Sequence, residues 1–169
     1  MDDISPNTAD FPLPPSLESR REQMFPKLAP AEITRLRRFG TVRTWQPGEL
    51  LFEPNRPGTG MFVLLRGHIL TTRKNGLGVE MPIIKAGPGD FTGEVGQLSG
   101  RPPLAYGRAL EEVEALVIDP PSLRAVVVVE AELGERIMRA LILRRVGLIE
   151  IGGGGPLLIG PPGGAGTVR

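Results

Sequence analysis

The central part of the chain, from Thr41 to Asp119, alternates short apolar segments with turns rich in glycine and proline. Segments such as TVRTW, ELLFE, MFVLLRG and HILTTRK are a few residues long, and sequences such as QPG and PNRPGTG separate them. Short runs of β-branched and aromatic residues between turn residues predict strands. About eight strands spaced this closely predict a β-sandwich or barrel.

Individual residues refine this prediction. Asn75-Gly76 is expected to form a turn with a positive φ, and Pro82 predicts that its strand is an edge strand or carries a bulge. The segment PGDFTGEVGQLSG is expected to be a glycine-rich connection. Trp45 and Phe62 are predicted to belong to the core. Three glycines are interpreted as structural turn residues rather than ligand contacts: Gly48, Gly60 and Gly67.

Helical patterns flank the strands. LAPAEITRLRRFG predicts a helix, with Pro30 in its first turn. After the strands, Asp119 is a suitable N-cap for a helix that begins at Pro120, although the four valines that follow favour a strand by propensity. A further helix is predicted from an apolar stripe at helical spacing: Leu133, Ile137, Ala140, Leu141 and Val146.

These patterns divide the chain into three parts. Residues 1–26 are expected to form an irregular arm with a short helix around residues 16–24. Residues 27–150 form the domain, whose predicted fold class is mainly β: an eight-stranded jelly-roll-like barrel or sandwich with flanking N-terminal and C-terminal α-helices. Residues 151–169 are expected to be a Gly/Pro-rich linker and the start of a truncated second domain.

Composition narrows the classes of function. The net charge of +1, with acidic and basic residues interspersed, argues against a protein built to neutralise many nucleic-acid phosphates. The absence of cysteine excludes disulfides and thiol redox chemistry within the chain, and the single histidine, His68, excludes a multi-histidine metal site. No signal peptide or membrane-spanning run is evident. We expect a soluble, cytoplasmic protein that binds no metal, has no nucleic-acid or membrane partner and is not an enzyme by itself.

The order of helix, short strands and two closing helices resembles the cyclic nucleotide-binding domain family, which includes the effector domain of catabolite activator proteins. PGELLFEPNRPGTGMFVLLRGHI resembles the opening strands of that family, including a turn at Pro47-Gly48. PGDFTGEVGQLSGRPPLAYGRA resembles the family's phosphate-binding cassette. The resemblance covers about residues 27–150 and implies cyclic AMP or cyclic GMP as a possible ligand.

The cassette resemblance implies roles for individual residues. Gly93 matches the position where backbone N–H groups approach the phosphate. Glu94 matches the ribose-binding glutamate, and Ala105 matches the alanine that closes the motif. The candidate ligand-binding residues are Gly93, Glu94, Val95, Arg101, Ala105 and Arg108.

The motif departs from the family at one position. Pro103 or Leu104 stands where the phosphate-binding arginine belongs, and Arg101 lies too early and Arg108 too late to match it. Losing an arginine–phosphate interaction of about 3 kcal/mol weakens binding roughly a hundredfold, so a micromolar site becomes about a 100 µM site. The hypothesis is that cyclic nucleotides bind weakly or that another small anionic ligand takes their place.

Two further expectations concern the helices. The basic pairs Arg37-Arg38 and Arg144-Arg145 are interpreted as solvated helix faces. The apolar face of residues 131–150 is expected to cover the mouth of the barrel, to form the seam of a homodimer, or both.

Three functions remain open from the sequence. The tail, ALILRRVGLIEIGGGGPLLIGPP, resembles the N-terminal part of bacterial thioredoxin-reductase-type flavoproteins that carry a fused cyclic nucleotide-binding domain. That resemblance implies a regulatory module for a downstream FAD- and NADPH-dependent disulfide reductase, with both cofactors in a part absent from this chain. One alternative is the effector domain of a catabolite-activator-like transcription regulator. The other is a degenerate interaction domain that binds no nucleotide.

Overall fold

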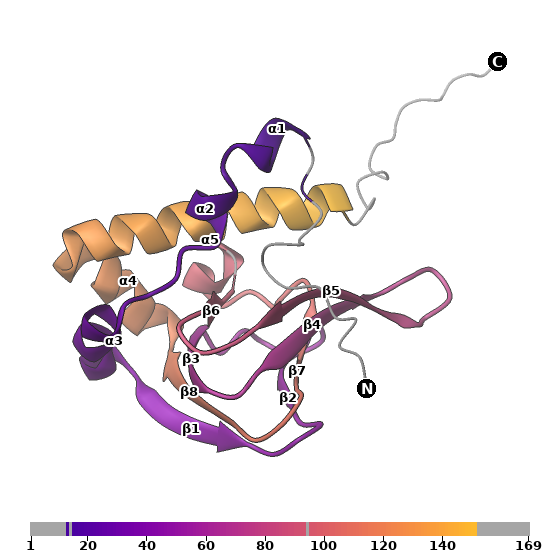
Figure 1. The fold of residues 1–169 in the computed structure, drawn as a ribbon, viewed down its shortest axis with the longest axis horizontal. Coiled ribbons are helices and arrows are strands. Elements are labelled where there is room, and N and C mark those ends of the chain that lie inside the picture. Colours follow the sequence, from indigo (N-terminus) through magenta and orange to yellow (C-terminus); the bar gives the residue numbers. More distant parts are fainter. Residues whose placement is uncertain (1–12, 14, 94, 152–169) are drawn as a thin grey trace.

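The protein is a two-sheet sandwich covered along one side by helices in a computed structural model, which describes residue 13, residues 15–93 and residues 95–151 (Figure 1). The strands are β1 (Thr41–Trp45), β2 (Leu50–Phe52), β3 (Met61–Arg66), β4 (Ile69–Lys74), β5 (Glu80–Ala86), β6 (Phe91–Thr92), β7 (Tyr106–Ala109) and β8 (Val113–Ile118). The helices are α1 (Pro15–Glu18), α2 (Arg21–Met24), α3 (Pro30–Leu36), α4 (Pro120–Val129) and α5 (Ala131–Ile151), with 3-10 turns η2 (Arg37–Phe39) and η3 (Val95–Ser99).

The eight strands form two antiparallel sheets of four. One sheet has the order β1-β8-β3-β6 and the other has the order β2-β7-β4-β5. The predicted fold class is therefore confirmed. β5 is an edge strand, and its pairing with β4 shifts register opposite Pro82, as that proline predicted.

The central strands β3 and β8 are largely buried on both faces, which explains why residues 61–65 (MFVLL) are continuously apolar. Successive side chains of a strand point to opposite faces. Met61 and Val63 pack toward the helices, whereas Phe62 and Leu64 face the second sheet. Trp45 packs edge-on against Phe62 with the ring centroids 5.6 Å apart, which confirms both as core residues.

The first closing helix begins where the sequence predicted. Asp119 accepts a hydrogen bond from the backbone N–H of Ser122 at 2.9 Å, and Pro120 follows as the first helical residue. The strand propensity of the four valines is overruled because α4 buries Leu123 and Val126 against the sandwich. Burial of an apolar face outweighs the small intrinsic preference of β-branched residues for strands.

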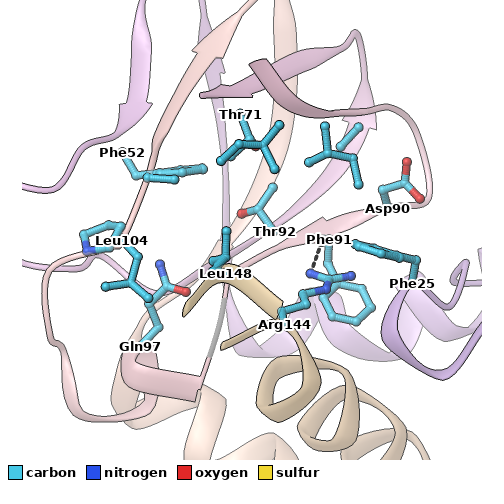
Figure 2. Close-up of a pocket in the computed structure, with 16 residues that line it drawn as sticks. Phe25, Phe52, Thr71, Asp90, Phe91, Thr92, Gln97, Leu104, Arg144 and Leu148 are labelled. Carbon is cyan, nitrogen blue, oxygen red and sulfur yellow. Dashed lines mark hydrogen bonds between the residues drawn. The ribbon is translucent and has the colours of Figure 1, made fainter. Parts of the chain in front are cut away.

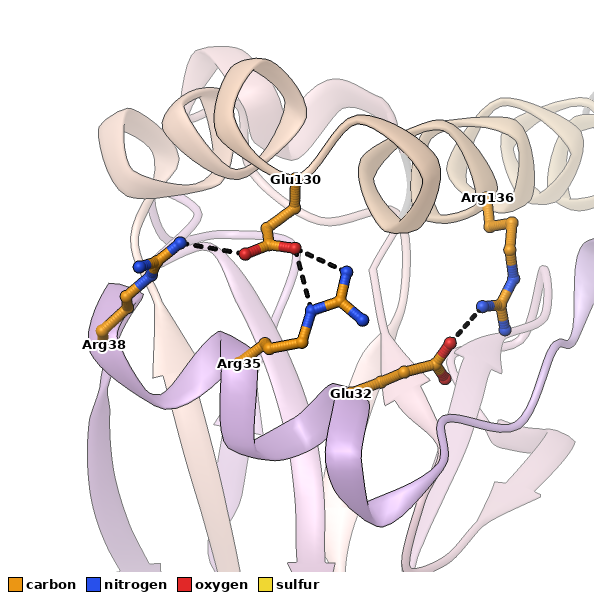
Figure 3. Close-up of polar contacts among 5 residues, drawn as sticks. All are labelled: Glu32, Arg35, Arg38, Glu130 and Arg136. Carbon is orange, nitrogen blue, oxygen red and sulfur yellow. Dashed lines mark hydrogen bonds and ion pairs between the residues drawn. The ribbon is translucent and has the colours of Figure 1, made fainter.

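An ionic cluster holds α3 and η2 against the corner between α4 and α5 (Figure 3). Glu130, in that corner, accepts hydrogen bonds from Arg35 at 2.6 Å and Arg38 at 2.9 Å. Glu32 pairs with Arg136 of α5 and also accepts the Ala29 backbone N–H at 2.9 Å. Arg38, expected to be simply solvated, is therefore an exposed side chain with an ionic partner.

Three local expectations were wrong in detail. The positive φ in the β4–β5 turn is at Gly78 (+81°), not Gly76, because the Asn75 carboxamide accepts the N–H groups of Leu77 and Val79. The glycine-rich connection contains an unexpected strand, β6, ahead of the short helical turn η3. The helix expected around residues 16–24 is two single turns, α1 and α2, which bury Leu17 and Met24 in a cluster with α5.

The predicted stripe on α5 is correct at four positions and wrong at the fifth. Leu133, Ile137, Ala140 and Leu141 are buried against the sandwich and α4. Val146 is 39% exposed because it falls on the opposite face of the helix. The predicted linker and truncated second domain lie outside the described residues, apart from Ile151 at the end of α5.

Candidate ligand-binding site

A cavity lies between the end of the sandwich and α5 (Figure 2). It contains about 680 Å³ of empty space, part of which is open to solvent. Strands β2, β4, β5 and β6, the turn η3 and residues 103–105 form its walls, and Phe25, which follows α2, and helix α5 contribute to the rest. The cavity is therefore built jointly by the sandwich and the closing helix.

The lining is mostly apolar, with a few polar groups. Apolar side chains from both sheets and the helices form most of the wall: Phe25, Phe52, Ile83, Ile84, Ala86, Phe91, Leu104 and Leu148. The polar side chains are Thr71, Asp90, Thr92, Gln97 and Arg144. An apolar cavity with a few placed polar groups is the usual form of a small-molecule site.

Arg144 is a buried residue of this cavity, which corrects its interpretation as part of a solvated face. Its side chain leaves α5 toward the sandwich and is 8% exposed. Nε donates to the Met24 carbonyl at 2.9 Å and Nη1 donates to the Phe91 carbonyl at 2.7 Å. The guanidinium also lies 4.4 Å from the ring centroid of Phe91 and 5.1 Å from that of Phe25. Arg144 thereby links α5 to both β6 and the N-terminal segment.

The charge of Arg144 is only distantly compensated. Burial lowers the pKa of its guanidinium to about 10, while the Asp90 carboxylate acts in the opposite direction, so the group stays protonated at neutral pH. Asp90 itself pairs with Lys27 at 3.1 Å and accepts the Gly87 N–H at 2.8 Å. Burying an ion without a close counter-ion costs roughly several kcal/mol. Lys27, Asp90 and Arg144 together leave one positive charge beside the cavity.

Thr92 contributes an unsatisfied hydroxyl. The residue is 7% exposed and lines the cavity from β6. Its Oγ1 has no hydrogen-bond partner among the described residues. Buried polar groups are nearly always hydrogen-bonded, and an orphaned one requires an explanation. A ligand with a polar atom in this cavity would supply one.

Gly93, the first candidate residue of the cassette resemblance, lies at the cavity. Gly93 lines the cavity with a φ of +123°, where any other residue would be strained. It precedes the short turn η3, which begins at Val95 and places the buried Gln97 in the cavity wall. Glu94, the expected ribose ligand, lies outside the described residues.

The end of the cassette has no cation facing the cavity. Pro103, Leu104 and Ala105 all line it, so an apolar wall occupies the expected position of the phosphate-binding arginine. Arg101 is exposed and is not part of the wall. Among the described lining residues, Arg144 is the one cationic side chain, and it comes from the opposite side of the cavity (Figure 2).

Arg108 also lies away from the cavity. Its neighbour on β7, Ala109, belongs to the core between the sheets, so alternation along the strand points Arg108 outward. There it donates to the Gly48 carbonyl at 2.9 Å and pairs with Glu80 at 3.1 Å. The structure thus brings Gly93 and Ala105 together at the cavity and keeps Arg101 and Arg108 apart from it.

Other kinds of site receive no support in the described part of the chain. No group of three or more His, Asp or Glu side chains there is placed to hold a metal ion. Within the same residues, no helix combines the length and apolar character needed to cross a bilayer. The cavity is the candidate functional site.

A β-sandwich with a cassette-like turn and a cavity closed by a C-terminal helix defines the class of ligand-binding regulatory domains. The family model described as cyclic nucleotide-binding domain matches residues 42–128, slightly more than half of the chain. The chain therefore belongs to the cyclic nucleotide-binding domain family.

Relatives agree with this assignment. The chain is 24% identical over 124 residues to a CRP-like cAMP-activated global transcriptional regulator of Mycobacterium tuberculosis, covering 73% of this chain and 55% of the relative. It is 26% identical over 122 residues to a cyclic nucleotide-gated potassium channel of Mesorhizobium japonicum, covering 72% of this chain and 32% of the channel. The chain thus spans only part of the curated relatives that it matches.

A solved structure shows the same fold. The catabolite activator protein of Thermus thermophilus superposes with a TM-score of 0.63 at 23% identity, covering 76% of this chain and 60% of that protein. Its identity is too low to carry more than the fold.

One residue of the candidate site, Arg144, was missed by reasoning from the sequence, although a signal for it exists. The buried positions Leu133, Ile137 and Leu141 of α5 recur every four residues, and extending the series by three reaches Arg144. The following arginine, Arg145, is rotated about 100° around the helix. An arginine at a core position of an amphipathic helix indicates a buried charge.

Proposed function

We propose that this chain is a regulatory sensing domain that binds a small molecule in the cavity and reports its presence through α5. The observation that carries the proposal is that α5 supplies Arg144 and Leu148 to the cavity wall. Any ligand held there contacts the sandwich and the closing helix at once, so its binding energy can differ between two positions of the helix.

The contacts of α5 suggest how the signal would leave the cavity. Arg144 bonds the carbonyls of Met24 and Phe91, and Arg73 of β4 donates to the Leu148 carbonyl at 2.5 Å. A ligand that draws the guanidinium toward itself competes with these carbonyls. The position of α5 relative to β6 and the N-terminal turns then depends on occupancy.

For cyclic nucleotides we propose weak or altered binding. Pro103 and Leu104 replace the cation that would neutralise the phosphate, and Arg101 and Arg108 do not face the cavity. Gly93, Glu94, Val95 and Ala105 remain the candidate contacts of such a ligand through the cassette resemblance. Calorimetric titration with cyclic AMP and cyclic GMP should give dissociation constants of about 100 µM or weaker. Low-micromolar binding that is lost in Glu94→Ala would refute the weak-binding proposal.

A homodimer through α5 is part of the same proposal. Ile142, Val146 and Ile149 follow one another at helical spacing and are each 39–46% exposed. A self-associating stripe would bury them and tie the output helix of one subunit to that of the next. Size-exclusion chromatography with light scattering should give a dimer for the wild type and a monomer for Ile142→Asp, and a wild-type monomer at high protein concentration would refute this point.

The output of the sensor is proposed separately. The tail resembles that of thioredoxin-reductase-type flavoproteins, which favours a downstream reductase domain holding FAD and NADPH. One relative is named a transcriptional regulator, so the effector domain of such a regulator is the alternative and a nucleic-acid partner for the whole protein stays open. An interaction domain that binds no nucleotide is the third candidate function. Sequencing the complete gene product distinguishes a reductase domain from a helix-turn-helix.

A further inference from the structure

From the structure we infer that the natural ligand of the cavity is an amphiphilic anion, an apolar body with one carboxylate-type group, and that Arg144 and Thr92 bind the anionic group. The inference rests on the proposed ligand-sensing function and specifies its ligand class. It places the negative charge against α5, on the side of the cavity opposite the cassette residue Leu104 (Figure 2).

The charge balance favours a single negative charge. Two of the five N–H groups of Arg144 are used by the Met24 and Phe91 carbonyls, and among the described residues no acceptor occupies Nη2. Asp90 is bound to Lys27 and to a backbone N–H, so the cluster carries a net charge of +1. One carboxylate neutralises it, and a planar guanidinium matches that group in geometry.

Thr92 offers a second hydrogen-bond donor to the anionic group. Its orphaned hydroxyl lies on β6 next to Phe91, whose carbonyl bonds Arg144. A hydroxyl that donates to the same anion as the guanidinium would gain its missing partner. Thr92 and Arg144 both line the cavity, so one ligand group that accepts from the two donors would account for both unexplained polar features of the site.

The rest of the cavity fits an apolar body. Phe52, Ile83 and Ile84 line it from the second sheet, and Leu104 and Leu148 line it from the cassette and α5. Leu104 has no donor for a phosphate. A cyclic nucleotide anchored through the cassette would leave its phosphate against Leu104 and would leave Arg144 without an anionic partner.

The experiment is isothermal titration of the full chain with phenylacetate, with its uncharged isostere phenylacetamide, and with cyclic AMP. We expect the wild type to bind phenylacetate at least tenfold more tightly than phenylacetamide. Arg144→Met should weaken phenylacetate binding about 10- to 100-fold and abolish the preference for the acid, since a hydrogen bond to a charged group is lost. The matched control is Arg145→Met, whose arginine does not line the cavity and whose variant should bind as the wild type does.

A second variant keeps the inference testable if Arg144→Met does not fold. Thr92→Val should reduce phenylacetate affinity about fivefold or more and phenylacetamide affinity by less, because a hydrogen bond to an uncharged carbonyl contributes less than one to a carboxylate. A merely structural role would lower both affinities equally. Equal affinity for acid and amide, or no binding of phenylacetate at millimolar concentration, overturns the inference. If cyclic AMP binds in that case, the sensing function stands and only the ligand class is wrong. If neither binds, the proposed function falls as well.

Discussion

Replacing Thr92 with valine should stabilise the free protein, although it removes a polar group from a candidate site. The Thr92 hydroxyl is buried and unpartnered among the described residues, and such a group costs about 1–3 kcal/mol. It faces a cavity partly open to water, so the low end of that range applies, and we expect Thr92→Val to raise the free energy of unfolding by about 1 kcal/mol. For a domain of this length that corresponds to roughly 3 °C in Tm.

Thr72→Val provides a matched control with the opposite sign. Thr72 is as deeply buried as Thr92, but its hydroxyl donates to Glu80 Oε1 at 3.0 Å. Removing that hydrogen bond should lower the free energy of unfolding by about 1 kcal/mol. Urea and thermal denaturation of the two variants beside the wild type measure the difference. If Thr92→Val is destabilised as much as Thr72→Val, the Thr92 hydroxyl has a partner and the argument for a ligand that supplies one is refuted.

Two further predictions concern the fold. A hydrogen bond from Arg35 lowers the pKa of Glu130, and one from the Ala29 N–H lowers the pKa of Glu32. The two carboxylates therefore stabilise the folded protein fully above the unfolded pKa of about 4.3, and this stabilisation is lost as the pH falls through their lower folded pKa values. Urea unfolding from pH 6 down to about pH 3 should show this loss, and Glu130→Gln should show a smaller one. An unchanged pH slope in that variant would be evidence against a stabilising role of the ionic cluster. Gly60→Ala should lower the free energy of unfolding by about 2 kcal/mol or more in the same assay, because Gly60 has a φ of +114° and an added Cβ would collide with the Ile118 carbonyl. A variant as stable as the wild type would contradict this backbone conformation.

The fold was predictable from the sequence because its determinants are local. Turn glycines and prolines separate the strands, and Asp119 with Pro120 marks the start of α4. Strand β6 was missed because two residues, Phe91 and Thr92, are too short to show alternation. The helical state of the valines in α4 depends on burial against the sandwich, a tertiary effect that propensity does not contain.

The site was predictable only where it resembles a family motif. Gly93 and Ala105 line the cavity as the cassette implied. Arg144 lies some fifty residues later in the chain, and nothing in an Arg-Arg pair on an amphipathic helix states which arginine turns inward. Which arginine is buried depends on which face of α5 packs on the sandwich. The buried residues of the stripe define that face, whereas Val146 lies on the exposed side of the helix.

We propose that this family member has exchanged nucleotide-phosphate recognition for a different ligand anchor. Calorimetric titration of cyclic AMP into the wild type and into Leu104→Arg tests it most directly, since Leu104 lines the cavity where the cation is missing. We expect a dissociation constant of about 100 µM or weaker for the wild type and binding roughly tenfold to a hundredfold tighter for Leu104→Arg. Low-micromolar binding by the wild type, with no gain from the new arginine, would contradict it.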